Sequence, residues 1–304
     1  MSSRGHRVAC CGPLPAEVVR TLIRAVRSAT DRPLNVNFIT FLVKEEQIGV
    51  CIDEAVPIVS FHWGHPPRLV IDRLHGAGIK VWEQVGSVES ARRGVEDGID
   101  LIVAQGTEAG GHNYGTLPTF VLVPTIVEAV APVPVLAAGG IATGRQLAAV
   151  LALGAVGGWV GTRFVASTEA FADPQYKQRL LEAEGTQTRL SSVYGPDLPQ
   201  FNPMRVLDLG LAREFAGRED RAPKDLHSQP LIATMKLMGE AIPLHRFSNF
   251  VPTPQTEGDI SQLPFLSGQG VGLVRELRPA REILHEMIEE AAAVLSNLMA
   301  QTRD

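Results

Sequence analysis

Cysteine is scarce in this sequence. The 304 residues include three cysteines, Cys10, Cys11 and Cys51, and their spacing fits neither a disulfide framework nor a set of zinc ligands. This usage is typical of a reducing compartment. We therefore expect a cytoplasmic protein and predict no metal site.

Long apolar runs and an excess of positive charge are also lacking. No apolar stretch reaches the roughly 20 residues that a membrane-spanning helix needs, and the opening MSSRGHRVACCG lacks the apolar core of a signal peptide. Lys and Arg number 28 against 33 Asp and Glu, which gives a net charge of −5. We therefore expect neither a membrane nor nucleic acid as a partner.

What the sequence does contain is a regular alternation of short apolar runs and helical patterns between about residues 35 and 165. Ser87 has the position of a helix N-cap, and Gly98 follows the end of the same helix. The predicted strands are apolar on both faces, which is typical of a parallel sheet covered by helices. We place strands at 34–39, 57–61, 79–85, 99–106, 133–140 and 157–165, and helices at 66–78, 87–98 and 143–155.

Glycines follow the predicted strands where each strand ends, at Gly106, at Gly139 with Gly140, and at Gly161. The alternation alone leaves open a doubly wound sheet or a closed barrel. Active sites of (β/α)₈ barrels are built at the carboxyl ends of the strands, and the last two strands often hold a phosphate. A dinucleotide fold would have G-x-G-x-x-G after its first strand, which this chain does not show. The glycines therefore favour an α/β fold of the TIM-barrel type.

The pattern changes beyond residue 170, which suggests three parts. We predict a barrel core with the cofactor site at 8–171, a lid or insertion after the last strand at 172–230, and C-terminal helices that pack on the barrel at 231–304. Helical patterns occur at 174–185, at 203–217, at 231–243 and along 279–300.

Two glycine sites, one βα unit apart, could together hold a phosphate. Gly139 and Gly140 allow backbone N–H groups to approach an anion closely, and Gly161 with Thr162 offers another N–H and a hydroxyl. Glycines that merely permit tight turns are the simpler explanation of either site alone. The pairing of the two sites favours phosphate binding.

Three segments, AQGTEAGGH (104–112), VPVLAAGGIATG (133–144) and GTRF (161–164), together resemble the nitronate monooxygenase family, formerly called 2-nitropropane dioxygenases. DRPLNVNF and SGQGVGLV are similar to further family segments, so that the likeness runs from about Cys10 to Leu277. The resemblance implies an FMN-dependent TIM-barrel flavoenzyme. FMN-dependent enoyl-acyl-carrier-protein reductases share most of these motifs.

The resemblance also implies roles for individual residues. His112 matches the family histidine beside the reactive face of the flavin, where an imidazole can exchange a proton near neutral pH. His62, at a predicted strand end, could contact substrate. The residues implied to bind FMN are Asn37, Gln84, Gln105 and Gly106 near the ring, Gly110 and Gly111 where backbone approaches the cofactor, and Ala138, Gly139, Gly140, Gly161 and Thr162 around the phosphate.

The family's usual first strand and helix have no match here, because HRVACCGPLPAEVV resembles the second strand and helix. We therefore expect seven barrel strands. The activity implied first is oxidation of alkyl nitronates or nitroalkanes by molecular oxygen. The alternatives are an enoyl reductase that uses NAD(P)H and FMN, and a barrel impaired by loss of its first strand. The partners expected are a small-molecule substrate and oxygen, with self-association left open.

Overall fold

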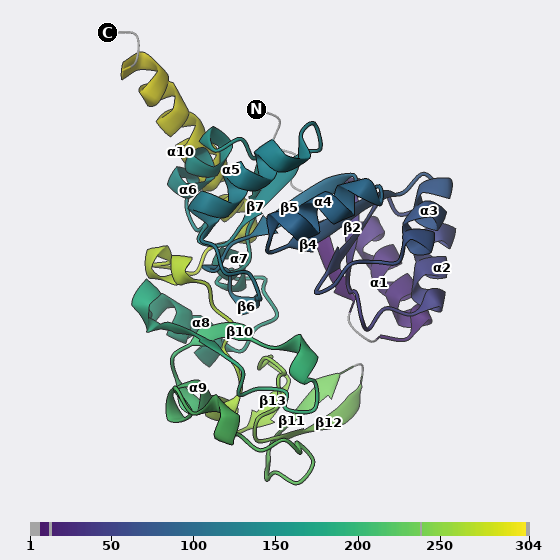
Figure 1. The fold of residues 1–304 in the computed structure, drawn as a ribbon. Coiled ribbons are helices and arrows are strands. Elements are labelled where there is room, and N and C mark those ends of the chain that lie inside the picture. The colour runs from purple at the N-terminus through teal and green to yellow at the C-terminus, as the bar shows by residue number, and fades with distance from the viewer. Residues whose placement is uncertain (1–6, 12–13, 238, 302–304) are drawn as a thin grey trace. The chain divides into compact units, whose positions relative to one another are not determined.

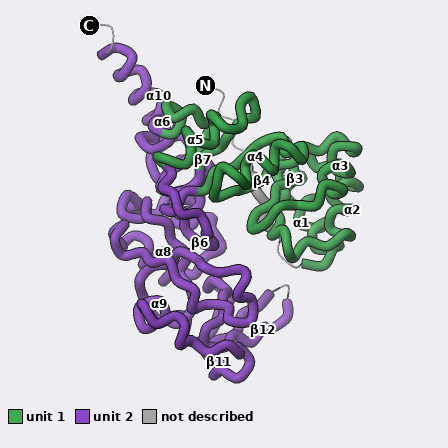
Figure 2. Tube along the Cα trace, viewed as in Figure 1, with its two compact units in different colours: residues 1–105, 120–137, 150–158 green, residues 106–119, 138–149, 159–304 purple. Residues whose placement is uncertain are grey.

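The computed structural model describes residues 7–11, 14–237 and 239–301, and the chain forms two compact units (Figures 1 and 2). Unit 1 contains residues 1–105, 120–137 and 150–158, and unit 2 contains 106–119, 138–149 and 159–304. The loops after two consecutive strands of the sheet thus group with the C-terminal half of the chain. This division does not test the boundaries predicted at 171/172 and 230/231, which stay predictions.

One seven-stranded sheet has the order β1-β2-β3-β4-β5-β7-β8, and the pairs from β1 to β5 are parallel. Among the described residues the order runs from β1 at one edge to β8 at the other, so the sheet is open. The α/β class with a parallel sheet is confirmed, and an incomplete barrel fits in part. The strands are β1 (Arg7–Cys11), β2 (Leu34–Ile39), β3 (Ile58–His62), β4 (Lys80–Val85), β5 (Leu101–Gln105), β7 (Val135–Ala138) and β8 (Gly157–Trp159).

Helices connect these strands, as the apolar strand pattern predicts. Ser87 caps its helix as expected, because its side chain accepts a hydrogen bond from the Ser90 N–H. One face of the sheet carries fully buried residues such as Val36, Phe38 and Phe61, and the helices also bury apolar side chains. The helices are α1 (Ala16–Ala29), α2 (Glu45–Asp53), α3 (Arg68–Gly76), α4 (Val88–Glu96), α5 (Thr119–Val130) and α6 (Gly144–Ala152).

Unit 2 contains two small antiparallel sheets, β6-β10-β9 and β12-β11-β13. Its main core includes Tyr176, Leu180, Met235, Phe265 and Val271. The elements are β6 (Gly111–His112), α7 (Thr162–Val165), α8 (Pro174–Glu182), β9 (Thr188–Ser191), β10 (Met204–Leu207), α9 (Gly210–Glu214), β11 (Leu231–Leu237), β12 (Glu240–His245), β13 (Thr256–Gly258), the 3₁₀ turn η5 (Gln269–Leu273) and α10 (Ala280–Gln301).

The helix predicted at 231–243 is wrong, because these residues form most of the hairpin β11–β12. β11 lies between β12 and β13, and its burial alternates around the middle of the strand: Ala233 and Met235 are buried, whereas Thr234 is half-buried and Lys236 is exposed. A period of two fits a strand with one face on the core, so tertiary context overrides the helix propensity of Ala, Met and Leu. The helix predicted at 203–217 is also wrong in its first half, which forms β10, and right at α9.

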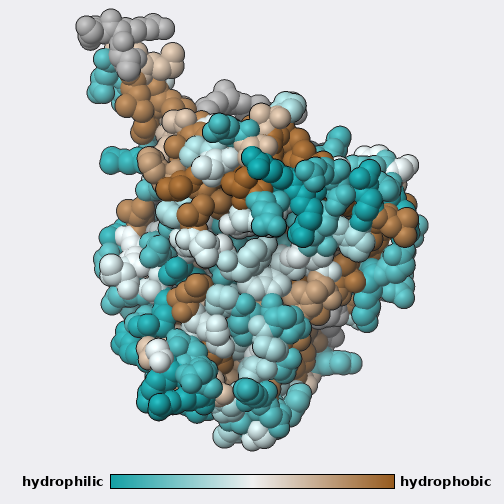
Figure 3. Space-filling model, viewed as in Figure 1, coloured by the Kyte–Doolittle hydropathy of each residue, from teal (hydrophilic) through white to brown (hydrophobic). Residues whose placement is uncertain are grey.

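Several helices carry exposed apolar side chains. Phe120 and Val121 lie at the start of α5, and Leu298 and Met299 lie near the end of α10, where Figure 3 shows apolar surface. Exposed apolar patches are a common sign of an interface, but self-association stays a prediction. None of the helices that the structure describes is both long enough and apolar enough to span a bilayer.

Ser87→Ala should lower the free energy of unfolding by about 1 kcal/mol, because the Ser90 N–H loses its acceptor. Urea denaturation followed by circular dichroism measures the loss. Ser87→Asp, which keeps an acceptor at the N-cap, should retain most of the stability. Equal losses in both variants would contradict the capping role.

Candidate active site

Four of the predicted site residues share one face of the sheet in unit 1. Asn37, Ser60, Trp82 and Leu101 lie in register across β2 to β5, so they face the same side. Steps of two residues along a strand keep to the same face, so His62 and Gln84, one step on, and Gln105, two steps on, also lie on that face. Asn37, His62, Gln84 and Gln105 thus lie on one face, within a few residues of the strand ends.

The amides among these four differ in burial. Asn37 is buried, and its Nδ2 donates hydrogen bonds to Ser60 Oγ at 2.8 Å and to the Ser60 carbonyl at 3.4 Å. Gln105 is buried and Gln84 is half-buried. Their predicted contacts with a flavin ring stay predictions.

His62 is held as a neutral imidazole. Its Nδ1 lies 3.0 Å from the Phe38 carbonyl, which can only accept a hydrogen bond, so Nδ1 carries the proton. Burial lowers the pKa of His62 to about 4, although the hydrogen bond opposes that shift. At neutral pH His62 can therefore donate at Nδ1 and accept at Nε2, without a positive charge.

The loop after β5 belongs to unit 2 and is organised by Asn113, a residue that the sequence analysis missed. Its buried side chain donates to the Gly106 carbonyl at 2.9 Å and accepts from the Gly115 N–H at 3.0 Å. The Gly106 N–H in turn donates to the Ala138 carbonyl. The hydrogen bond from the Gly115 N–H to the Asn113 side chain closes an Asx turn. The sequence N-Y-G at 113–115 could have suggested this turn.

Glu108 connects the same loop to the start of α5. Its carboxylate accepts hydrogen bonds from the Thr119 N–H, at 2.9 and 3.1 Å, and from the Thr119 hydroxyl at 2.9 Å. The Thr119 hydroxyl also lies 3.1 Å from the Gly139 carbonyl. An acidic side chain at this position satisfies a backbone donor that the helix leaves without a partner.

His112 lies in β6, paired with Met204 of β10. Its Nδ1 donates to the Phe201 carbonyl at 2.5 Å, and its ring stacks on the Phe201 ring with centroids 3.3 Å apart and planes 22° apart. The side chain is partly exposed. Phe201 gave no signal in the sequence, since it is 89 residues away in a segment without a motif.

Most of the predicted cofactor glycines have a reason for being glycine within the protein itself. A Cβ on Gly110 would lie 2.4 Å from the Gly268 nitrogen, and a Cβ on Gly106 would overlap Thr119. Gly139 and Gly140 have backbone φ angles of +105° and +72°, and Gly111 has +78°. Residues with a side chain rarely adopt such angles. Packing and backbone conformation therefore account for these five glycines without a ligand.

Gly161 is different. Its φ is −109°, an ordinary value, and no atom lies within 4 Å of the position that a Cβ would take there. The next residue, Thr162, accepts a hydrogen bond from the Gly268 N–H at 2.9 Å through its hydroxyl, which leaves its own O–H to donate. Open space beside bare backbone and a hydroxyl fits a phosphate group.

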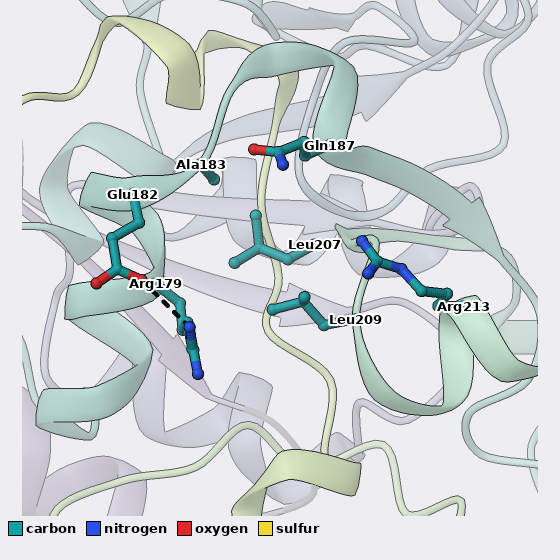
Figure 4. Close-up of a pocket in the computed structure, with 7 residues that line it drawn as sticks. All are labelled: Arg179, Glu182, Ala183, Gln187, Leu207, Leu209 and Arg213. Atoms are coloured by element: carbon teal, nitrogen blue, oxygen red, sulfur yellow. Dashed lines mark hydrogen bonds and ion pairs between the residues drawn. The ribbon is translucent and has the colours of Figure 1, made fainter.

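A pocket elsewhere in unit 2 contains none of the predicted residues. Figure 4 shows it with Leu207 and Leu209 at its centre, and Arg179 paired with Glu182 on one side. Arg213 lies on another side. Its two arginines are well exposed, and no feature of it points to chemistry. No group of three or more metal-ligating side chains occurs in the described part of the chain.

A family model, nitronate monooxygenase, matches residues 39–290. Rv1533 of Mycobacterium tuberculosis, whose name is that of a monooxygenase, is 36% identical over 80% of this chain and 61% of its own length. A nitronate monooxygenase of Neurospora crassa is 33% identical over 77% of this chain and 59% of its own length. The chain thus spans about three fifths of these two relatives.

Two solved structures resemble nearly the whole chain. FabK of Thermotoga maritima has a TM-score of 0.77 and 33% identity, covering 95% of this chain and 85% of its own. A nitroalkane oxidase of Streptomyces ansochromogenes has a TM-score of 0.78 and 27% identity, covering 96% of this chain and 89% of its own.

The low pKa of His62 predicts a stability that depends on pH. An unfolded histidine binds a proton near pH 6.5, whereas folded His62 does so only near pH 4. Its contribution to the free energy of unfolding, up to about 3 kcal/mol, is therefore lost as the pH falls from about 6.5 to 4. Between pH 7 and pH 4.5, the urea midpoint of unfolding should fall less for His62→Gln than for the wild type. The same fall in both proteins would contradict the assignment.

Proposed function

Since the chain belongs to the nitronate monooxygenase family, we propose that it is an FMN-dependent oxidoreductase that oxidises alkyl nitronates, and nitroalkanes, with molecular oxygen. The proposal of FMN as the cofactor rests on the open space beside the Gly161 backbone, next to the Thr162 hydroxyl. Neither packing nor φ requires a glycine at this position, but a bound ligand would, because a side chain there would collide with it.

The residues have separate tasks in this proposal. Gly161 and Thr162 hold the phosphate, with the backbone of Ala138, Gly139 and Gly140 as further candidates. When bound, FMN supplies the electron chemistry between substrate and oxygen. Asn37, Gln84 and Gln105 are proposed, from the resemblance alone, to contact the flavin ring, and His62 to contact substrate as a neutral donor or acceptor.

His112 is proposed as the base for neutral nitroalkanes. Such a substrate must lose the proton on the carbon beside the nitro group before it becomes a nitronate. An imidazole can accept that proton near neutral pH. A substrate supplied as the nitronate has already lost it and does not need the base.

The spectrum of the purified protein tests the cofactor first. A flavin spectrum, followed by heat release and chromatography against FMN and FAD standards, should identify FMN. Consumption of oxygen with an alkyl nitronate, in the absence of nicotinamide, tests the reaction. Release of FAD, or failure to take up added FMN, would contradict the proposal.

An alternative is an enoyl-acyl-carrier-protein reductase that uses NAD(P)H with FMN. The similarity to FabK is as high, at 33% identity, as that to the Neurospora crassa nitronate monooxygenase. Two results would favour this alternative: oxidation of NADH by the flavin-loaded protein in the absence of nitronate, and no oxygen uptake in the presence of nitronate.

Gly161→Val should remove FMN and leave the fold intact, because the new side chain enters open space that the phosphate is proposed to use. Flavin content and circular dichroism are measured together. Gly76→Val is the matched control, since a Cβ on Gly76 would also have no atom within 4 Å, and it should keep its flavin. Full occupancy in Gly161→Val would place the phosphate elsewhere. Gly140 is a poorer probe because its φ already excludes valine.

His112→Asn should slow turnover of neutral nitroalkanes by about 10² to 10⁴-fold, the usual contribution of a general base. Nitronate turnover on the same preparation should fall far less. Flavin content of the variant is measured alongside, because a disturbed flavin slows both substrates. An equal fall for both substrates, with flavin retained, would end the base assignment.

A further inference from the structure

Residues 201–204 of unit 2 hold His112 and the residue after it. The His112 Nδ1 donates to the Phe201 carbonyl, and the imidazole ring lies on the Phe201 ring. The N–H of Asn113 donates to the Pro203 carbonyl at 3.0 Å, and His112 pairs with Met204 in the β6–β10 ladder. Hydrogen bonds from the backbone and side chain, together with ring stacking, thus fix the imidazole from one side.

The segment that holds His112 is itself anchored. Phe201 is 6% exposed, and its N–H donates to the Leu198 carbonyl at 2.9 Å. Asn202 donates through its side chain to the Tyr194 carbonyl at 2.8 Å, and Tyr194 belongs to a buried cluster with Met204 and Val206. The position of the Phe201 carbonyl is therefore set by the core of unit 2.

A backbone carbonyl determines which nitrogen of a neutral imidazole carries the proton. It can only accept, at every pH, so Nδ1 must keep its hydrogen. The lone pair of neutral His112 is then at Nε2. A neighbouring carboxylate or hydroxyl would constrain the tautomer less strictly, since either can change between acceptor and donor.

We propose that Phe201 is the positioning residue of His112: its carbonyl makes Nε2 the proton acceptor, and its ring fixes the plane of the imidazole. The catalytic consequence rests on the proposed function. The C–H bond beside the nitro group breaks, its proton forms a bond to Nε2, and its electron pair moves into the nitro group. The products are the nitronate and the imidazolium of His112.

The tautomer is measured without any turnover. Protein labelled with ¹⁵N in histidine gives long-range proton–nitrogen correlations that distinguish a protonated from an unprotonated ring nitrogen, and the signals missing in His112→Asn assign His112. At a pH where His112 is neutral, the wild type should show protonated Nδ1 and unprotonated Nε2. A protonated Nε2 in the wild type would overturn the proposal.

The ring is tested by Phe201→Leu, which keeps the backbone carbonyl and loses the stacked ring. Without the stacked ring the imidazole can rotate away from the carbonyl, so the His112 signals should move towards a mixture of tautomers. Phe201→Tyr, which keeps a ring, should restore the wild-type pattern. Phe120→Leu, at a 70% exposed phenylalanine, controls for the substitution itself. A Phe201→Leu variant that retains a single Nδ1–H tautomer would overturn the role of the ring.

Kinetics separate this proposal from the proposed function. Phe201→Leu should reduce kcat for neutral nitroalkanes by about tenfold or more and shift its pH profile, with nitronate turnover within about twofold. Equal losses for both substrates, with flavin retained, would assign Phe201 a purely structural role. A protein without flavin, or without nitronate turnover, would instead contradict the proposed function, and the tautomer measurement would still decide the role of Phe201.

Discussion

The close approach of two glycine-bearing backbones determines the arrangement of unit 2 around the loop after β5. Gly110 and Gly268 face each other so tightly that a Cβ on either would overlap the other's backbone. The Gln269 N–H donates to the Glu108 carbonyl, and the Gly268 N–H donates to Thr162. Three segments that are far apart in the sequence meet at this point, and each limits the freedom of the other two.

This contact explains physically two motifs that were recognised in the sequence only because they resemble segments of a family. AGGH and SGQG are separate stretches of the chain, and each resembles a family segment. In the structure they are the two sides of one backbone contact. Several glycines that look like cofactor contacts are thus required first by protein packing, and Gly161 is the one of the predicted cofactor glycines that neither packing nor φ explains.

The sequence predicts the regular part of the fold well because its signals are local. Runs that are apolar on both faces identify the strands β2 to β5 and β7, and Ser87 and Gly98 mark the ends of α4 correctly. The strand predicted at 157–165 is right for β8 and wrong in its last part, which forms α7. The hairpin β11–β12 could not be predicted in this way, since its residues favour a helix in isolation. Phe201 and Asn113 were missed for a related reason: a carbonyl acceptor and a buried amide leave almost no trace in residue type, and the partners of Phe201 lie far along the chain.

The distance along the chain between these partners has a consequence for synthesis. The strands of the sheet are complete by residue 159, so that part of the fold can form while the rest of the protein is still being made. The loop that carries His112 must wait for a carbonyl 89 residues later, and Thr162 waits for an amide 106 residues later. On the ribosome, the nascent chain can therefore pass through a stage in which the strands of the sheet have formed and the loop after β5 has not yet assembled.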